Sequence, residues 1–190
     1  MRLHPDKPGI RALGVAESFR QGQKRSVLAG VVMRSDSVVD GVALGKTEVG
    51  GDDATRSIAS LVRRLRRNDI NVLLVSGAIL SLYNIVDADA LSARTRLPVI
   101  CLTYKETSGI EASIRRHFPE GAETKLEAYR RLGERAGVKL KTGHRVFVRT
   151  AGLDEGEAKG ILDAFTLQGS VPEPVRVAKL LARAAMAWRS

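Results

Sequence analysis

The sequence predicts an α/β fold in which a three-stranded meander is followed by parallel βα units. Three apolar runs come first, and only short turns separate them. From residue 53 the hydrophobic spacing becomes that of a helix, and short apolar runs then alternate with helical segments. No repeat, low-complexity tract or linker divides the 190 residues, so we expect a single domain over residues 1–190.

The first three elements are expected to be strands. Residues 10–19, 26–33 and 38–44 are rich in aliphatic side chains, and polar turns at 21–24 and 35–37 separate them. The run 27–33 contains no polar residue, which is typical of a strand buried on both faces. Successive strands joined by short turns pair in antiparallel order, so these three form a meander.

Helices and strands alternate after residue 53. One helical stripe is formed by Ala54, Ile58, Leu61, Val62 and Leu65. Short strands are expected at 71–75 and 98–103, with a helix at 86–95 between them, as parallel pairing requires. Further helices are expected at 110–118, 123–136, 154–165 and 174–188, with a late strand at 146–148. This order is the ribonuclease-H-like arrangement with extra C-terminal helices, whereas a doubly wound sheet would begin with βα.

The charge balance favours a polyanionic partner. Lys and Arg number 31 against 21 Asp and Glu, which gives a net charge of +10. An excess of this size attracts phosphate backbones, so we expect DNA as the partner, with RNA as the alternative. Candidate phosphate contacts are Arg63, Arg64, Lys105 and Arg176, and the alternative for each is an ordinary solvated surface.

Other classes of protein are disfavoured by composition. No apolar stretch approaches the ~20 residues of a membrane span, and the N-terminus lacks the apolar core of a signal peptide. We therefore expect a cytoplasmic protein without a membrane partner. The single cysteine, Cys101, lies in an apolar run and is expected in the core, and with 3 His it leaves too few ligands for structural zinc. The sequence predicts no oligomeric state.

Carboxylates follow the predicted strands, where sites form in open α/β sheets. Glu17 closes the first strand, and a carboxylate there is costly to bury unless it meets a cation or a hydrogen-bond donor; otherwise it faces solvent or Arg20. Asp52 and Asp53 follow two glycines, and Asp53 either binds a cation or caps the next helix. Asp87 is either a ligand or part of an ordinary helix start. Such carboxylates together could hold Mg²⁺ for phosphodiester cleavage.

Several segments together resemble the mainly archaeal family known as domain of unknown function 99, or endonuclease dU. The resemblance covers nearly the whole chain. It rests on LGVAESF (13–19), VDG (39–41), VGGDDAT (49–55), YNIVD (83–87), PVI (98–100), QG (168–169) and PEPVRVA (172–178).

This resemblance implies an activity and its residues. The family is similar to endonuclease V, a ribonuclease-H-like, Mg²⁺-dependent enzyme for deaminated bases. It implies cleavage of strands containing deoxyuridine or a related deaminated base, as in DNA repair, with Mg²⁺ or Mn²⁺. Glu17 would replace the first-strand aspartate, Asp53 would supply the carboxylate of the next helix, and His144 would match a late-strand Gly-His pair. The catalytic candidates are thus Glu17, Asp53 and His144, and the metal ligands Glu17, Asp52, Asp53 and Asp87.

One departure from endonuclease V affects this set. Its fourth strand ends in an Asp-Gly pair, and here the pair is Ser76-Gly77. Because serine is a poor metal ligand, another carboxylate such as Asp87 would have to replace it, or one metal would be lost. The alternative function is therefore a non-catalytic nucleic-acid-binding protein with a degenerate site.

Overall fold

The computed structural model describes residues 9–106 and 109–188. Within them one mixed sheet has the strand order β3-β2-β1-β4-β7-β9-β8. Strands β1 (Arg11–Ser18), β2 (Arg25–Arg34) and β3 (Val39–Glu48) form the predicted antiparallel meander. Strand β4 (Val72–Val75) runs parallel to β1, and β7 (Val99–Thr103) runs parallel to β4. Strands β9 (Arg145–Ala151) and β8 (Ala136–Lys139) complete the sheet in antiparallel order. The ribonuclease-H-like fold class is confirmed.

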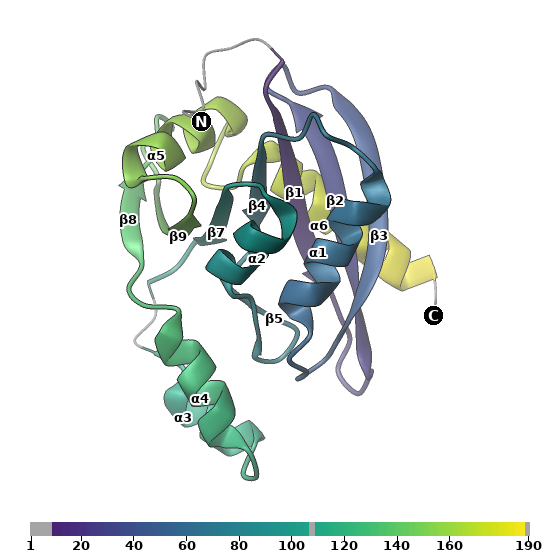
Figure 1. Ribbon diagram of the computed structural model, residues 1–190, viewed down its shortest axis with the longest axis vertical. Helices are drawn as coiled ribbons and strands as arrows, with labels where there is room; N and C mark the ends of the chain where they lie inside the picture. Colours follow the sequence, from purple (N-terminus) through teal and green to yellow (C-terminus); the bar gives the residue numbers. More distant parts are fainter. Residues whose placement is uncertain (1–8, 107–108, 189–190) are drawn as a thin grey trace.

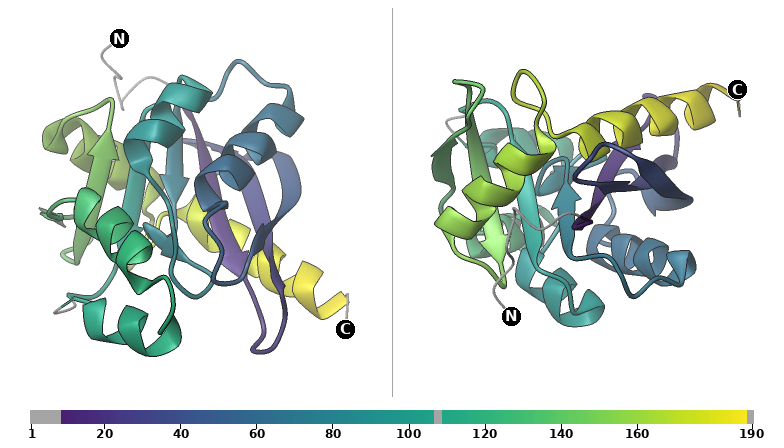
Figure 2. Two further views of the ribbon diagram at one scale, coloured as in Figure 1. Left: turned by 60° about the horizontal axis from the view of Figure 1, so that its bottom comes forward. Right: turned by 90° about the horizontal axis from the view of Figure 1, so that it is seen from above.

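Helices cover both faces of this sheet (Figure 2, right). Helices α1 (Ala54–Leu65) and α2 (Ala88–Thr95) lie on one face. Helices α5 (Glu155–Phe165) and α6 (Glu173–Trp188) lie on the other. The short helices α3 (Glu111–His117) and α4 (Ala122–Arg131) form a pair beyond the end of the sheet (Figure 1).

Alternating side chains of the central strands fill the two cores. On β1, Leu13 and Val15 point into the core under α1 and α2, whereas Ala12 and Ala16 point to the opposite face. Side chains of a strand alternate between the faces of its sheet, so a strand that is apolar throughout must be covered on both. The continuous apolar runs in the sequence are explained by this double coverage.

Helix α6 lies unusually close to the first strand. A Cβ atom built on Gly14 would lie only 2.2 Å from the carbonyl carbon of Pro174 and 2.5 Å from the backbone nitrogen of Val175. Only a residue without a side chain allows this approach. The first and last described elements of the chain are thereby packed together, backbone against backbone.

Three sequence-based expectations were wrong in detail. The helix expected at 123–136 ends at Arg131, because Gly133 adopts a left-handed φ of 65° and residues from Ala136 pair with β9 as β8. The strand expected at 38–44 continues to Glu48. The hairpin of β5 (Ile79–Leu80) and β6 (Asn84–Ile85) was not predicted, since strands of two residues leave no periodicity to detect.

No described helix is long and apolar enough to cross a membrane. Cys101 is buried, as expected.

The Gly14 contact predicts a large effect of one methyl group. Gly14→Ala should lower the free energy of unfolding by about 1–3 kcal/mol, because the new Cβ would overlap the α6 backbone. Urea denaturation measures the change. The matched control is Gly156→Ala at an exposed position of α5, where a Cβ would approach only Asp154 Oδ1 at 3.3 Å, so the change should stay within about 1 kcal/mol of the wild type. Equal effects at the two positions would contradict the close packing of α6.

Candidate active site

The β5–β6 hairpin crosses the carboxyl end of the central strands. It follows β4 directly, and the Gly50 amide donates a 2.7 Å hydrogen bond to the Ser81 carbonyl. Three consecutive hairpin residues that are not glycine, Ser81, Leu82 and Tyr83, have φ angles of 31°, 58° and 64°. Such left-handed conformations are costly for residues with a Cβ and persist only where surrounding contacts enforce them. The contacts that enforce this turn include two carboxylates.

Glu17 is the first of these carboxylates. It ends β1 on the same face as Leu13 and Val15, where it is half-buried. Its Oε1 accepts a 2.9 Å hydrogen bond from the Ser81 amide, and its Oε2 accepts one from the Ser81 hydroxyl. The Ser81 hydroxyl also shares a 2.7 Å hydrogen bond with Ser26. A partly buried carboxylate requires hydrogen-bond donors, and for Glu17 these are the amide and hydroxyl of Ser81 in the hairpin rather than Arg20.

Asp53 is the second carboxylate, and four donors surround it. Its Oδ1 accepts from the Thr47 hydroxyl at 2.6 Å, the Asn84 amide at 2.7 Å and the Glu48 backbone N–H at 3.0 Å. Its Oδ2 accepts from the Ser57 hydroxyl at 2.9 Å. Burial alone would raise the pKa of Asp53, but these hydrogen bonds outweigh it and lower the pKa below the ordinary value of 3.8. Asp53 is therefore ionised at neutral pH.

Asn84 joins these groups and was missed by sequence reasoning. Its side chain is 0% exposed. Its amide nitrogen lies within hydrogen-bonding distance of Asp53, of the Thr47 hydroxyl at 3.1 Å and of the Glu48 carbonyl at 2.8 Å. Its Oδ1 accepts a 2.9 Å bond from the Ala54 N–H at the start of α1. Asn84, not Asp53, thus caps the first helical amide.

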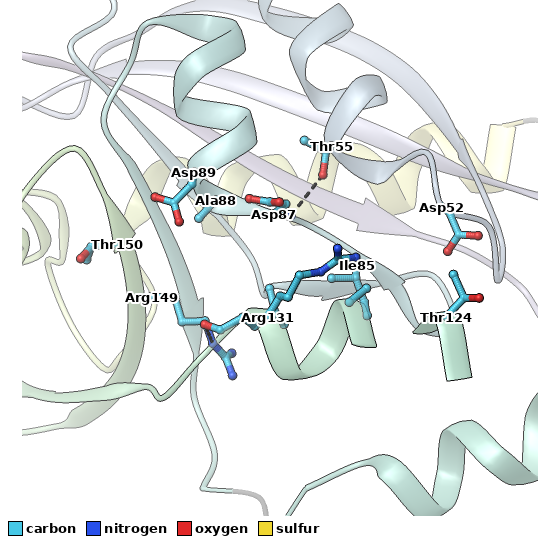
Figure 3. Close-up of a pocket in the computed structure, with 12 residues that line it drawn as sticks. Asp52, Thr55, Ile85, Asp87, Ala88, Asp89, Thr124, Arg131, Arg149 and Thr150 are labelled. Atoms are coloured by element: carbon cyan, nitrogen blue, oxygen red, sulfur yellow. Dashed lines mark hydrogen bonds between the residues drawn. The ribbon is translucent and has the colours of Figure 1, made fainter. Parts of the chain in front are cut away.

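The remaining acidic candidates have other partners. Asp52 is exposed and forms a 2.7 Å ion pair with Lys125, a buried lysine of α4. Asp87 caps α2 by accepting a 2.9 Å hydrogen bond from the Ala90 N–H, so it forms the ordinary helix start that the sequence left open. Both line a cavity of about 280 Å³, in which Figure 3 places Asp52 at one end and Asp89 toward the other.

His144 is not brought to these carboxylates. It is exposed in the turn between β8 and β9. Strands β4 and β7 separate β9 from β1, so about 14 Å of sheet lies between the strand of Glu17 and that of His144. A single metal shell cannot span this distance.

The basic candidates are also dispersed. Arg63 and Arg64 end α1, Lys105 follows β7, and Arg176 lies on α6. Arg176 forms an ion pair with the buried Glu173, which raises the pKa of its guanidinium. These four residues do not form one patch.

Ser76 directly follows β4, at the position where the resemblance to endonuclease V implies an aspartate. It lines a cavity of about 400 Å³ together with Tyr83, Tyr104 and Arg149. Burial raises the pKa of the Tyr104 hydroxyl to about 12, and the neighbouring Ser76 hydroxyl acts in the opposite direction. Tyr104 is therefore a neutral phenol at physiological pH.

The carboxylates have the chemistry of a metal site but not its arrangement. Carboxylate oxygens are the ligands that Mg²⁺ prefers. However, both oxygens of Glu17 and both of Asp53 already accept hydrogen bonds. Within residues 9–106 and 109–188, no three His, Cys, Asp or Glu side chains lie close enough to hold a metal ion. Because Mg²⁺ is usually held by one or two carboxylates together with water and phosphate oxygens, a divalent cation here would have to displace some of these hydrogen bonds and take its remaining ligands from water or substrate.

Comparisons with known proteins agree on a family and a fold. A family model described as Endonuclease dU matches residues 8–186. A UPF0215 protein of Pyrobaculum calidifontis is 36% identical over 171 residues, which cover 90% of this chain and 93% of that protein. The crystal structure of an Archaeoglobus fulgidus protein of unknown function superposes with a TM-score of 0.80 at 27% identity, covering 93% and 98% of the two chains. Endonuclease V of Ciona intestinalis, solved with an inosine-containing DNA, superposes at 0.62 with 14% identity, covering 100% and 92%.

The hydrogen bonds of Asp53 predict a pH-dependent loss of stability. Asp53→Asn should lower the free energy of unfolding by about 1–3 kcal/mol at neutral pH, because the amide NH₂ cannot accept from the surrounding donors. The pKa of Asp53 is lowered in the folded state, so its contribution is present above 3.8 and is lost as the pH falls through the folded-state value. Urea denaturation at about pH 7 and about pH 3 should thus show a smaller difference in acid.

Asp87→Asn is the control for this substitution. Asparagine caps helices as well as aspartate does, so the change should be within about 0.5 kcal/mol at either pH. A stability of Asp53→Asn equal to that of the wild type at neutral pH would refute the role assigned to this network.

Proposed function

Because the chain belongs to the endonuclease dU family, we propose that it is an endonuclease that cuts nucleic acid at deoxyuridine or a related deaminated base. Removal of such bases is a DNA repair reaction, so DNA is the proposed substrate and RNA the alternative. The family match, the fold shared with endonuclease V and the net charge of +10 support the proposal.

The placement of Glu17 and Asp53 carries the proposal. Both carboxylates lie at the carboxyl end of the central sheet, where sites form in folds of this type. One short hairpin contacts both, through Ser81 on Glu17 and Asn84 on Asp53. Capping of α1 does not explain these two carboxylates, because Asn84 already accepts from the first helical amide.

The two carboxylates have different proposed roles. Glu17 is only half-buried, and its contacts come from a single serine, so it is the group proposed to meet the scissile phosphodiester and to accept a proton from the attacking water. Asp53, which four donors keep ionised, positions the loop of residues 48–53 beside it. The resemblance to endonuclease V adds a requirement for Mg²⁺ or Mn²⁺ to the proposal, which a chelator tests directly.

The second candidate function is nucleic-acid binding without cleavage. It is favoured by Ser76, a poor metal ligand that directly follows β4. It is also favoured because no three His, Cys, Asp or Glu side chains among residues 9–106 and 109–188 lie close enough together to hold a metal ion. It predicts binding that weakens steeply with salt and gives no cleavage product.

A cleavage assay on labelled oligonucleotides separates the two functions. Single and double strands carrying deoxyuridine, inosine or no lesion would be incubated with Mg²⁺, Mn²⁺ or EDTA. We expect nicking at the deaminated base with either metal and none with EDTA. Glu17→Gln should slow cleavage by about 100-fold or more, because a positioned proton acceptor contributes that much, while the Kd for the strand changes by less than about twofold.

The control variant for this assay is Glu48→Gln, which removes an exposed carboxylate of the neighbouring loop and should cut at the wild-type rate. Cleavage by Glu17→Gln at the wild-type rate would eliminate Glu17 as the catalytic group. Measurable binding without a product under every metal condition would establish the second candidate.

A further inference from the structure

A groove with basic walls lies between the start of β2, the end of β3 and the C-terminal half of α6. Its cations are Lys24, Arg25, Lys46 and Arg64, and we call it the basic groove. It consists of two adjoining depressions of about 320 and 260 Å³ that share Arg25, Val27 and Lys46. Its apolar lining comes from Val27, Leu44, Ala185 and Met186.

No ion pair within the described chain neutralises the cations of the basic groove, although Glu48 lies opposite Arg25 in the register of β2 and β3. None of the residues that line it is acidic. Among the ion pairs of residues 9–106 and 109–188, Arg11, Arg34, Arg67 and Arg176 each have a carboxylate partner. By contrast, no carboxylate pairs with Lys24, Arg25 or Lys46 there, and Arg64 donates to the uncharged Leu44 carbonyl at 3.1 Å. Such a cluster attracts an anionic partner.

Trp188 ends α6, the helix whose residues Ala185 and Met186 line this groove. It is the only tryptophan of the chain, and its side chain is 91% exposed. Residues three and four apart share a face of a helix, so Trp188 lies on the same side of α6 as Ala185, which lines the groove. An exposed indole next to unpaired cations is the combination that binds unpaired nucleotides, since bases stack on aromatic rings and phosphates pair with Lys and Arg.

The strand residues of the basic groove and those of the candidate active site lie on opposite faces of the sheet, and Arg64 of α1 reaches the groove at the β3 edge, where it donates to the Leu44 carbonyl. Side chains of successive strand residues point to opposite faces. On β3, Lys46 lines the groove, whereas Thr47 turns the other way and donates to Asp53. A strand bound in the groove would therefore lie across the β3 edge from Glu17 and Asp53 without occupying their site.

We propose that the basic groove binds the phosphate backbone of an unpaired nucleic-acid strand, with Trp188 stacking on one of its bases. The inference rests on the proposed function in one respect, namely that this strand is a flank of the substrate. The acidic side chains of a peptide would satisfy the cations but offer no aromatic ring to stack on the exposed indole, so nucleic acid is the partner that the residues favour.

Trp188 reports on the groove directly, because no other tryptophan contributes to the emission. The probe is an undamaged polythymidine strand of about 20 nucleotides, which is long enough for one such site. We expect this strand to quench the tryptophan emission at low salt and to lose its effect as salt is added. A dye-labelled copy of the strand measures affinity independently by anisotropy.

Two variants test the cations and the indole separately. Arg25→Gln with Lys46→Gln should weaken binding about tenfold or more at low salt and reduce the slope of log K against log salt by about 1.4, since each phosphate contact on a single strand contributes about 0.7. The control pair is Arg94→Gln with Lys139→Gln, which removes the same charge from α2 and from β8 at the opposite edge of the sheet. It should retain full quenching. Trp188→Ala should weaken binding about tenfold in the anisotropy assay.

Each outcome decides the inference. Binding and emission that are the same in Arg25→Gln/Lys46→Gln as in the wild type would overturn it, while lesion-dependent cleavage would leave the proposed function intact. Equal quenching by polyglutamate would overturn nucleic acid as the partner. Failure of the wild-type chain both to bind the strand and to cut a deaminated one would overturn the inference and the proposed function together.

Discussion

The side chain of Asn84 is buried where three segments of the chain meet, and each segment uses it as a hydrogen-bond partner. It bonds the end of β3 through the Glu48 carbonyl, the start of α1 through the Ala54 amide, and Asp53 between them. Apart from the longer glutamine, no other residue type presents an amide donor and a carbonyl acceptor on one side chain. A buried polar network of this kind is favourable only when every member is satisfied. The position of Asp53, and with it the loop before α1, therefore depends on the β5–β6 hairpin.

This dependence extends to the helical pair α3–α4. Tyr83 of the hairpin contacts the His117 and Phe118 rings at centroid distances of 5.3 and 6.1 Å. Lys125 of α4 donates to the Gly51 carbonyl at 3.0 Å in addition to pairing with Asp52. The β5–β6 hairpin, the loop of residues 48–53 and the helices α3 and α4 thus form one packed unit next to the two carboxylates. A ligand that displaced α3 and α4 would shift the surroundings of Glu17 and Asp53 without contacting either residue.

Sequence patterns predicted the sheet and its helices because these elements are long and periodic. The strand expected at residues 10–19, for example, is β1 (Arg11–Ser18), a run long enough and apolar enough to be recognised. The placement of Glu17 at the end of β1 followed from the same reasoning. What could not be predicted was the hairpin, since its strands have two residues each and its turn uses left-handed Ser81, Leu82 and Tyr83 without a glycine. Asn84 was missed with it, because a buried asparagine has no distinctive spacing in a sequence.

The contact between Gly14 and α6 has a consequence for synthesis of the protein. Strand β1 precedes the other strands and lies in the middle of the sheet, yet Gly14 and Ala16 are covered on one face by α6, residues 173–188. A nascent chain therefore exposes the apolar surface of Ala16 and Val31 until residues 173–188 have emerged from the ribosome. This part of the sheet stays uncovered until α6 can pack on it.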